Sequence, residues 1–169
     1  MKNPLEEVWE NREEVVYPRL FGPKARGIFV LTPELFQEVF KQESIDGRWL
    51  HYGVLEFGPT HRGTYIYATS GASNPWEIDP EDYAKQEFSG FGTELALETR
   101  QSADWPIVIL QRLLAFNILL VHGRYGEPKP LDYWHRVPIG PVTKGSALTH
   151  VLIAPPVSYE AQFSLASKD

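Results

Sequence analysis

The stretch IVILQRLLAFNILLV, residues 107–121, constrains the fold more than any other part of the chain. It is long enough for a helix, whereas a membrane span needs about 20 apolar residues. Its polar residues, Arg112 and Asn117 among them, fall on more than one side of that helix, so neighbouring elements must cover much of its circumference. Asp104, with Pro106 in the first turn, marks its start. We therefore expect a buried helix at the centre of the core.

Composition limits the class of protein and its partners. The 169 residues fit one domain, and their 43% apolar and 13% aromatic content excludes a disordered chain. The formal charge is -6 and Lys and Arg form no run, which argues against nucleic acid as a ligand. An acidic surface instead suits a basic partner.

Two absences narrow the chemistry and the location. The chain has no cysteine, which removes disulfides, thiolate nucleophiles and cysteine-based metal sites. Its first residues, MKNPLEEVWENREE, are acidic and lack the apolar core of a signal peptide. Both observations fit a cytoplasmic protein, and neither indicates contact with a membrane.

Two helices are expected before the first strands. Asn3 and Pro4 have the character of a helix cap and a first-turn residue. Apolar residues then recur at helical spacing, with the charged Arg12 at one position of the same face. We expect Pro18 to end this helix. A second helix is expected over residues 32–41, which start with Thr-Pro and carry one apolar face.

Short apolar or alternating runs predict the strands. They cover 49–57, 64–70, 91–99 and 147–156, while 27–31 is either a strand or a buried extended loop. The runs 49–57 and 64–70 flank a loop that contains Gly-Pro, which indicates an antiparallel hairpin. Helices and strands interleave and no linker divides them, so the sequence predicts one compact unit.

The stretch SGFGTELALETR, residues 89–100, raises the question of a phosphate-binding loop because Gly90 and Gly92 flank an aromatic residue. Phosphate loops follow a strand and open a helix, whereas alternation here places Leu95 in a strand that the glycines enter. Glu94 and Glu98 would also repel a phosphate. The glycines are therefore interpreted as a structural entry turn.

Two groups of residues are candidates for catalysis or metal binding. His122, Asp132 and His135 combine imidazole and carboxylate, but their spacing matches no helix-borne ligand pattern, so histidines that only hold a loop are the favoured interpretation. The hydroxyls of TSGASN, residues 69–74, lack the glycines that bracket the serine of a hydrolase elbow. A turn that satisfies its own backbone donors is favoured there.

The acidic stretch after residue 75 is the candidate contact surface. Its carboxylates lack the ligand spacing of a calcium loop, and a solvated loop is the plainer interpretation. Aromatic residues, however, supply much of the energy at interfaces, and surrounding carboxylates steer a basic partner. The functional hypothesis assigns partner binding to Trp76, Glu77, Asp79, Glu81, Asp82 and Tyr83.

The order of these segments resembles the suppressor of fused domain family. A strand ending in YATSGASN precedes GFGTELALET, WPIVILQRLLAFNIL and SALTHVLIAPP, so the resemblance covers about Trp49 to Pro156. The family's Thr-x-Gly-x-Ser turn and Gly-Phe-Gly-x-Glu-Leu strand fall on Thr69, Gly71, Ser73, Gly90, Phe91, Gly92, Glu94 and Leu95.

The resemblance implies an α+β fold: a mixed, largely antiparallel β-sheet flanked by helices, in a single compact domain over residues 1–169. It implies no catalytic residue, no metal and no cofactor. Large animal members join this domain to a second one and hold a transcription factor of the Hedgehog pathway, and their two-domain cleft does not carry over to this short chain. The chain stops at FSLASKD, where the family implies another strand, so either the C-terminus is truncated or the last sheet edge is built differently.

Short stand-alone members of the family are mainly bacterial, and many resemble immunity proteins encoded beside secreted toxins. The resulting hypothesis is a non-catalytic cytoplasmic protein-binding domain, in particular an immunity protein that neutralises a basic toxin domain. Two alternatives stay open. One is a small hydrolase that uses His122, Asp132 and His135, and the other is a self-associating structural module that pairs its sheet edges.

Overall fold

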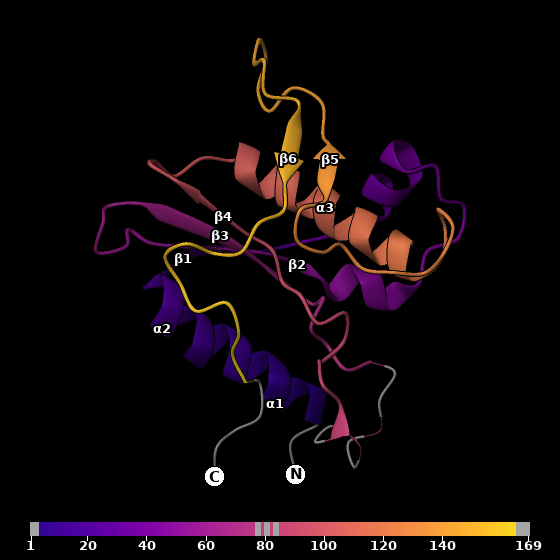
Figure 1. Cartoon of the computed structure of the whole chain (residues 1–169), viewed down its shortest axis with the longest axis horizontal. Helices are drawn as coiled ribbons and strands as arrows, with labels where there is room; N and C mark the ends of the chain where they lie inside the picture. Colours follow the sequence, from indigo (N-terminus) through magenta and orange to yellow (C-terminus); the bar gives the residue numbers. More distant parts are fainter. Residues whose placement is uncertain (1–3, 77–78, 80–81, 83–84, 165–169) are drawn as a thin grey trace.

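The apolar helix α3, Trp105–Val121, lies at the centre of the fold, as its sequence predicts. The computed structural model describes residues 4–76, 79, 82 and 85–164. One face of α3 packs on a four-stranded sheet, and another face of α3 is covered by a two-stranded sheet (Figure 1). The fold class is α+β, and every strand pairing in the described residues is antiparallel.

The larger sheet has the strand order β1-β2-β3-β4. The predicted hairpin is confirmed, because β2 and β3 pair antiparallel from Gly53 opposite Ser70 to Phe57 opposite Ile66. Alternate residues of these strands face opposite cores: Val54 and Tyr67 lie on the α3 side, and Leu55 lies on the other. The strands are β1 Lys24–Val30, β2 Gly53–Phe57, β3 Tyr65–Ser70 and β4 Ala96–Thr99.

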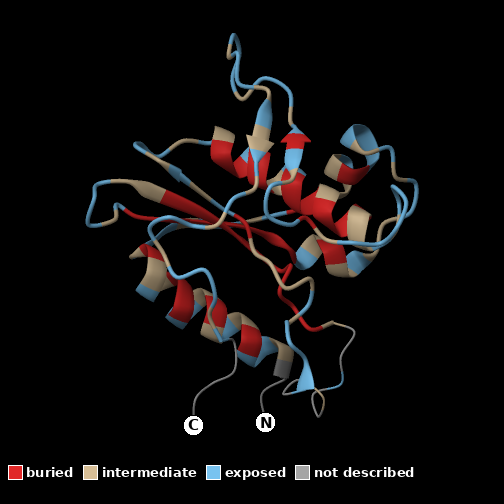
Figure 2. Cartoon of the chain, in the orientation of Figure 1, coloured by how far each residue is buried: buried red, intermediate tan, exposed pale blue. Residues whose placement is uncertain are grey.

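The N-terminal helix covers the second face of this sheet (Figure 2). It is continuous through α1 Pro4–Glu10, the π-helical segment η1 Asn11–Val16 and α2 Tyr17–Phe21. The expectation that Pro18 ends it is wrong: Pro18 falls in the first turn of α2, after the π-helical segment, where its missing N–H is tolerated. The proposed cap residue Asn3 lies outside the described residues.

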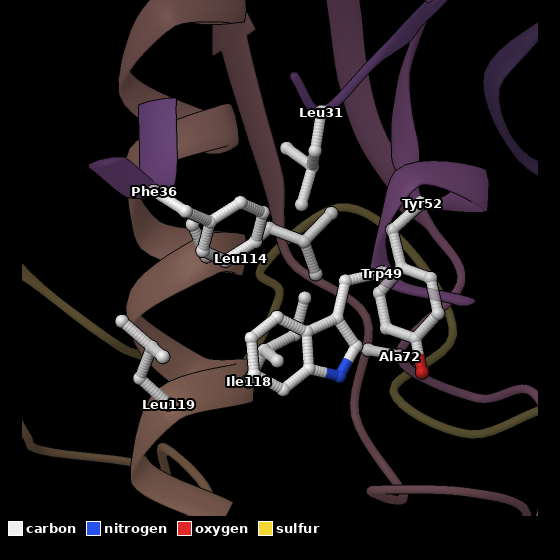
Figure 3. Close-up of a cluster of buried hydrophobic side chains, with 9 residues drawn as sticks. Leu31, Phe36, Trp49, Tyr52, Ala72, Leu114, Ile118 and Leu119 are labelled. Atoms are coloured by element: carbon white, nitrogen blue, oxygen red, sulfur yellow. The ribbon is translucent and has the colours of Figure 1, made fainter. Parts of the chain in front are cut away.

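The aromatic run from residue 49 is not a strand at its start. Residues Gly47–His51 form the 3₁₀-helix η3, because the Asp46 side chain accepts a hydrogen bond from the Arg48 N–H and caps the turn. Trp49 is thereby turned into a core with Phe36, from the helical segment η2 Leu35–Val39, and with side chains of α3 (Figure 3). The expected helix over 32–41 is confirmed in this wider, π-helical form.

The last predicted strand is shorter and less buried than expected. Of residues 147–156, only β6 His150–Leu152 is a strand, and it pairs with β5 Arg136–Pro138 in a separate two-stranded sheet. Its inner residue Val151 packs toward α3, while Leu152 is 58% exposed. A hairpin that covers the core with one face buries only every second residue.

No helix among the described residues has both the length and the apolar content required to cross a lipid bilayer.

Candidate functional site

The carboxylate of Glu94 organises the turn that follows β3. It accepts hydrogen bonds from the Thr69 hydroxyl at 2.7 Å, the Gly71 N–H at 3.0 Å, and both the N–H and the hydroxyl of Ser73 at 2.9 and 2.6 Å. Four donors from TSGAS thus converge on one side chain. The motif Thr-x-Gly-x-Ser and the Glu of Gly-Phe-Gly-x-Glu-Leu are two halves of one hydrogen-bonded unit.

Arg12, from the middle of the N-terminal helix, donates hydrogen bonds to the same turn. Its side chain is fully buried, and it donates to the Ser70 hydroxyl at 2.7 Å, the Ser73 hydroxyl at 2.9 Å and Asn74 Oδ1 at 2.8 Å. Its Nη1 lies 3.7 Å from Glu94 Oε1. A buried guanidinium needs both a counter-charge and acceptors for its N–H groups. Glu94 supplies the charge and the turn supplies the acceptors.

Two further side chains of the helix contact the same turn. The Ser70 hydroxyl donates to Glu13, whose carboxylate is 3.5 Å from the Arg12 guanidinium. The Tyr17 hydroxyl donates to the Thr69 carbonyl at 2.6 Å. Burial, with the Glu94 charge adding to it, raises the pKa of Tyr17 well above its ordinary value, so this phenol stays a donor.

The glycines of the motif are required by close backbone approach. A Cβ on Gly90, whose φ is +58°, would lie 2.5 Å from the Ala72 carbonyl oxygen and 2.6 Å from that of Asn74. Gly90 is therefore pressed against the turn, as the entry-turn interpretation requires. The strand begins later than predicted, at Ala96, because the Leu95 N–H is taken by the Thr69 hydroxyl in place of a ladder carbonyl.

A pocket of about 340 Å³ opens beside this turn. It lies where the motif turn, η3 and the C-terminal end of α3 meet. Ring contacts connect its walls: Trp49 and His122 have centroids 5.1 Å apart, and Phe91 and His122 have centroids 6.3 Å apart. Aromatic side chains therefore dominate its surface. The residues that line it include Trp49, Tyr52, Asn74, Trp76, Phe91 and His122.

Two buried donors at this pocket have no hydrogen-bond acceptor within the described part of the chain: Asn74 Nδ2 and Trp76 Nε1. Leaving such a donor unpaired costs about 1 to 3 kcal/mol. The Trp76 indole lies near the Tyr52 hydroxyl without reaching hydrogen-bond geometry. This partial contact opposes the rise in the pKa of Tyr52, which burial causes first and the Glu94 charge second. Unmet donors beside an aromatic pocket mark a place where a ligand acceptor would be stabilised.

Three of the six residues assigned to the acidic contact surface lie in the described part of the chain. Trp76 is half-buried and packs edge-on to Trp9 at 5.9 Å. Asp79 is exposed, and Asp82 receives a hydrogen bond from Lys85 Nζ at 2.5 Å, so its charge is partly neutralised. The remaining three residues of that hypothesis, Glu77, Glu81 and Tyr83, lie outside the described residues.

The structure does not bring His122, Asp132 and His135 together in a metal-binding group. His122 Nδ1 lies 2.8 Å from the Ile118 carbonyl, which fits a helix-terminal histidine that donates to its own helix. His135 Nδ1 accepts from the Asp132 N–H at 3.1 Å, which is a local loop contact. Among the described residues, no three His, Asp or Glu side chains gather in a way that could hold a metal ion.

Arg12 and the pocket were not identified as functional features from the sequence. The sequence contains one indication of the role of Arg12: a charged residue at an otherwise apolar helix position must find a buried partner. The pocket gave none, because Tyr52, Trp76 and His122 come from three separate segments.

Comparison with known proteins identifies the family. The family model described as suppressor of fused protein (SUFU) matches residues 48–168, which is most of the chain. No curated protein and no solved structure matches the chain. The suppressor of fused family is a non-catalytic family of protein-interaction domains. The chain therefore belongs to the suppressor of fused family, as a protein-interaction module of that kind.

Proposed function

We propose that this chain is a non-catalytic, cytoplasmic protein-binding domain that acts as an immunity protein against a basic bacterial toxin domain. The observation that carries the proposal is the family match over residues 48–168. The formal charge of -6 supports the choice of a basic partner, because charge complementarity speeds association and disfavours wrong partners.

A non-catalytic role is supported by the bonding of the hydroxyls in the motif. A serine nucleophile needs a free lone pair and access to substrate. Ser70 is buried, its oxygen accepts two N–H groups of Arg12, and its proton goes to Glu13. Ser73 donates to Glu94 and accepts from Arg12. These groups stabilise a turn, and they are poorly placed to attack a substrate.

The docking surface that we propose is the acidic, aromatic stretch that follows the pocket. Trp76 would supply a partly buried aromatic contact, and the carboxylates around it would orient a basic partner before contact. The surface comprises Trp76, Glu77, Asp79, Glu81, Asp82 and Tyr83.

Growth rescue tests the proposal. Where the adjacent gene encodes a secreted protein with a toxin-like C-terminal domain, that domain would be expressed in a bacterial host with and without this chain. We expect the chain to restore growth and to co-elute with that domain. We expect Gln or Asn at positions 77, 79, 81 and 82 to slow association severalfold at low salt and much less at high salt. If the wild-type chain gives no rescue and forms no complex, the immunity role is overturned. Equal association rates of wild type and variant at low salt would exclude this surface.

We also propose that residues 1–169 form one domain, although the family match begins at residue 48. Arg12 and Tyr17 from the N-terminal helix bond directly to the motif turn, so the helix should unfold with the sheet. Urea unfolding followed by far-ultraviolet circular dichroism and by tryptophan fluorescence should give coincident transitions. Two separate transitions would contradict a single domain.

Self-association is a second candidate function, favoured by one observation. Trp134, two residues before β5, is 68% exposed, and Leu152 of β6 is 58% exposed. Large exposed apolar side chains on one hairpin are typical of contact surfaces. Sedimentation equilibrium over a hundredfold range of concentration would detect a dimer, and Trp134→Ser should abolish it. A concentration-independent monomer would rule this candidate out.

A further inference from the structure

We propose that the pocket beside the motif turn binds an aromatic side chain of the partner polypeptide, with a carbonyl oxygen of that partner accepting hydrogen bonds from Asn74 and Trp76. This inference rests on the proposed protein-binding function and names the chemistry that the partner must present. The pocket volume of about 340 Å³ lies at the lower end of the range of small-molecule pockets in proteins.

The walls of the pocket select a ring. Trp49 and Phe91 both contact the His122 ring, at centroid distances of 5.1 and 6.3 Å. Tyr52 and Trp76 are nearly parallel, with 7° between their planes and 6.5 Å between their centroids. A guest ring among such walls gains offset-stacked or edge-to-face contacts that an aliphatic group does not make.

The unpaired donors select a hydrogen-bond acceptor. Arg12 can only donate, so the oxygen of the Asn74 amide must face its guanidinium at 2.8 Å. The nitrogen of the same amide, Nδ2, is buried at the pocket and has no acceptor among the described residues. The same holds for Nε1 of Trp76. Both atoms are closed off from solvent, so the wall must shift before a carbonyl that arrives with the guest can accept from these donors.

The described residues at the pocket offer a basic guest no free carboxylate, since nearby Asp46 is already paired with Arg48 at 2.6 Å. The cationic or potentially cationic side chains among its described lining residues are Arg48 and His122, and that set contains no carboxylate. A lysine or arginine side chain would therefore be desolvated there without a counter-charge. A phenylalanine, tyrosine or tryptophan side chain fits the walls, the donors and the charge together.

A nuclear magnetic resonance titration with capped amino acids tests this site without a partner protein. The ¹⁵N-labelled chain would be titrated with N-acetyl-phenylalaninamide, and the indole N–H signal of Trp76 would be assigned by its loss in Trp76→Phe. We expect that signal to shift downfield saturably, since the indole gains an acceptor. N-acetyl-alaninamide, which has the same carbonyls without the ring, should bind at least about tenfold more weakly, and N-acetyl-lysinamide should do the same.

Two valines of α3 provide a matched pair of variants. Val121 lines the pocket, whereas Val108 is exposed on the same helix. Val121→Phe should fill the pocket and abolish the shift, and Val108→Phe should leave it unchanged. If Val121→Phe does not give a folded spectrum, the comparison of the three probes on wild type still decides. A Trp76 signal that does not move, or that moves equally with the alanine probe, overturns the proposal. Such a failure leaves protein binding itself to the growth-rescue experiment, which uses no probe.

Discussion

The guanidinium of Arg12 lies 3.7 Å from the carboxylate of Glu94, and the two side chains are 0% and 6% exposed. Glu94 belongs to the family motif, but Arg12 lies before residue 48, where the family match begins. The motif turn is thus completed by a side chain from outside the matched region. This explains why Arg12 occupies an apolar position of its helix, and it makes the N-terminal helix part of the motif's structure.

Leu95→Ala should destabilise the fold by about 2 to 5 kcal/mol, because Leu95 is buried between the sheet and α3 and its truncation leaves a cavity. Urea unfolding would measure the loss. Val108→Ala, on the exposed side of α3, is the control and should change stability by less than about 0.5 kcal/mol. A loss that small for Leu95→Ala would show that the side chain is not part of the core.

Gly90→Ala should destabilise far more than Gly63→Ala. Both glycines have positive φ, +58° and +72°, so both variants carry backbone strain of about 1 to 2 kcal/mol. Only the Gly90 Cβ meets carbonyl oxygens at 2.5 and 2.6 Å, whereas nothing lies within 4 Å of a Cβ on Gly63. The difference between the two melting temperatures isolates this crowding. Equal temperatures would contradict the close packing of Gly90 on the turn.

Asp46 should make stability depend on pH at the acid end. The Arg48 side chain, followed by the Arg48 N–H, holds the pKa of Asp46 below its ordinary value of 3.8. The unfolded chain therefore binds a proton at a higher pH than the folded one, so this contribution is complete above 3.8 and is lost as pH falls through the lower folded pKa.

The comparison with Asp46→Asn isolates this carboxylate from the others. Asn is also a good cap, so the variant keeps a cap and loses the charge. Urea midpoints from about pH 5 to about pH 2 should show a gap between wild type and variant that closes as pH falls. A gap that stays constant over this range would mean that the Asp46 charge contributes nothing.

Zinc should leave the melting temperature unchanged, as should chelators. The His122 ring is engaged with its own helix and His135 with its own loop, whereas a bound metal would raise the temperature by mass action. Thermal melts with and without zinc provide the measurement. A reproducible stabilisation that disappears in His122→Ala would restore the hydrolase alternative.

Local patterns predicted the parts of the fold that local physics decides. The largely apolar run at 107–121 predicted a buried helix, and α3 is that helix. The alternating runs around the Gly-Pro loop could pair only as a hairpin, and β2 and β3 do so. Pro18 and the run from Trp49 were mispredicted because a π-helical segment and the Asp46 cap override propensity there.

The candidate site was less predictable because its parts meet only in three dimensions. The entry-turn interpretation of Gly90 followed from chain order and agrees with its contacts. The partners of Glu94 could not be foreseen, since the turn at 69–73 and Arg12 are brought to it by the sheet and by the helix beneath it. The pocket depends on ring packing between segments, which leaves no periodicity in the sequence.

A double-mutant cycle on Arg12 and Glu94 tests most directly the central claim that the family motif is a structural unit locked by a buried charge pair. Arg12→Met and Glu94→Gln should each cost about 3 to 5 kcal/mol in urea unfolding, because each leaves buried polar groups without partners. Arg19→Met and Glu160→Gln, which break an exposed pair at 3.4 Å, provide the control and should each change stability by less than about 1 kcal/mol. The Arg12–Glu94 double variant should lose at least about 1 kcal/mol less than the sum of its single variants. Losses that add to within about 0.5 kcal/mol would contradict the claim.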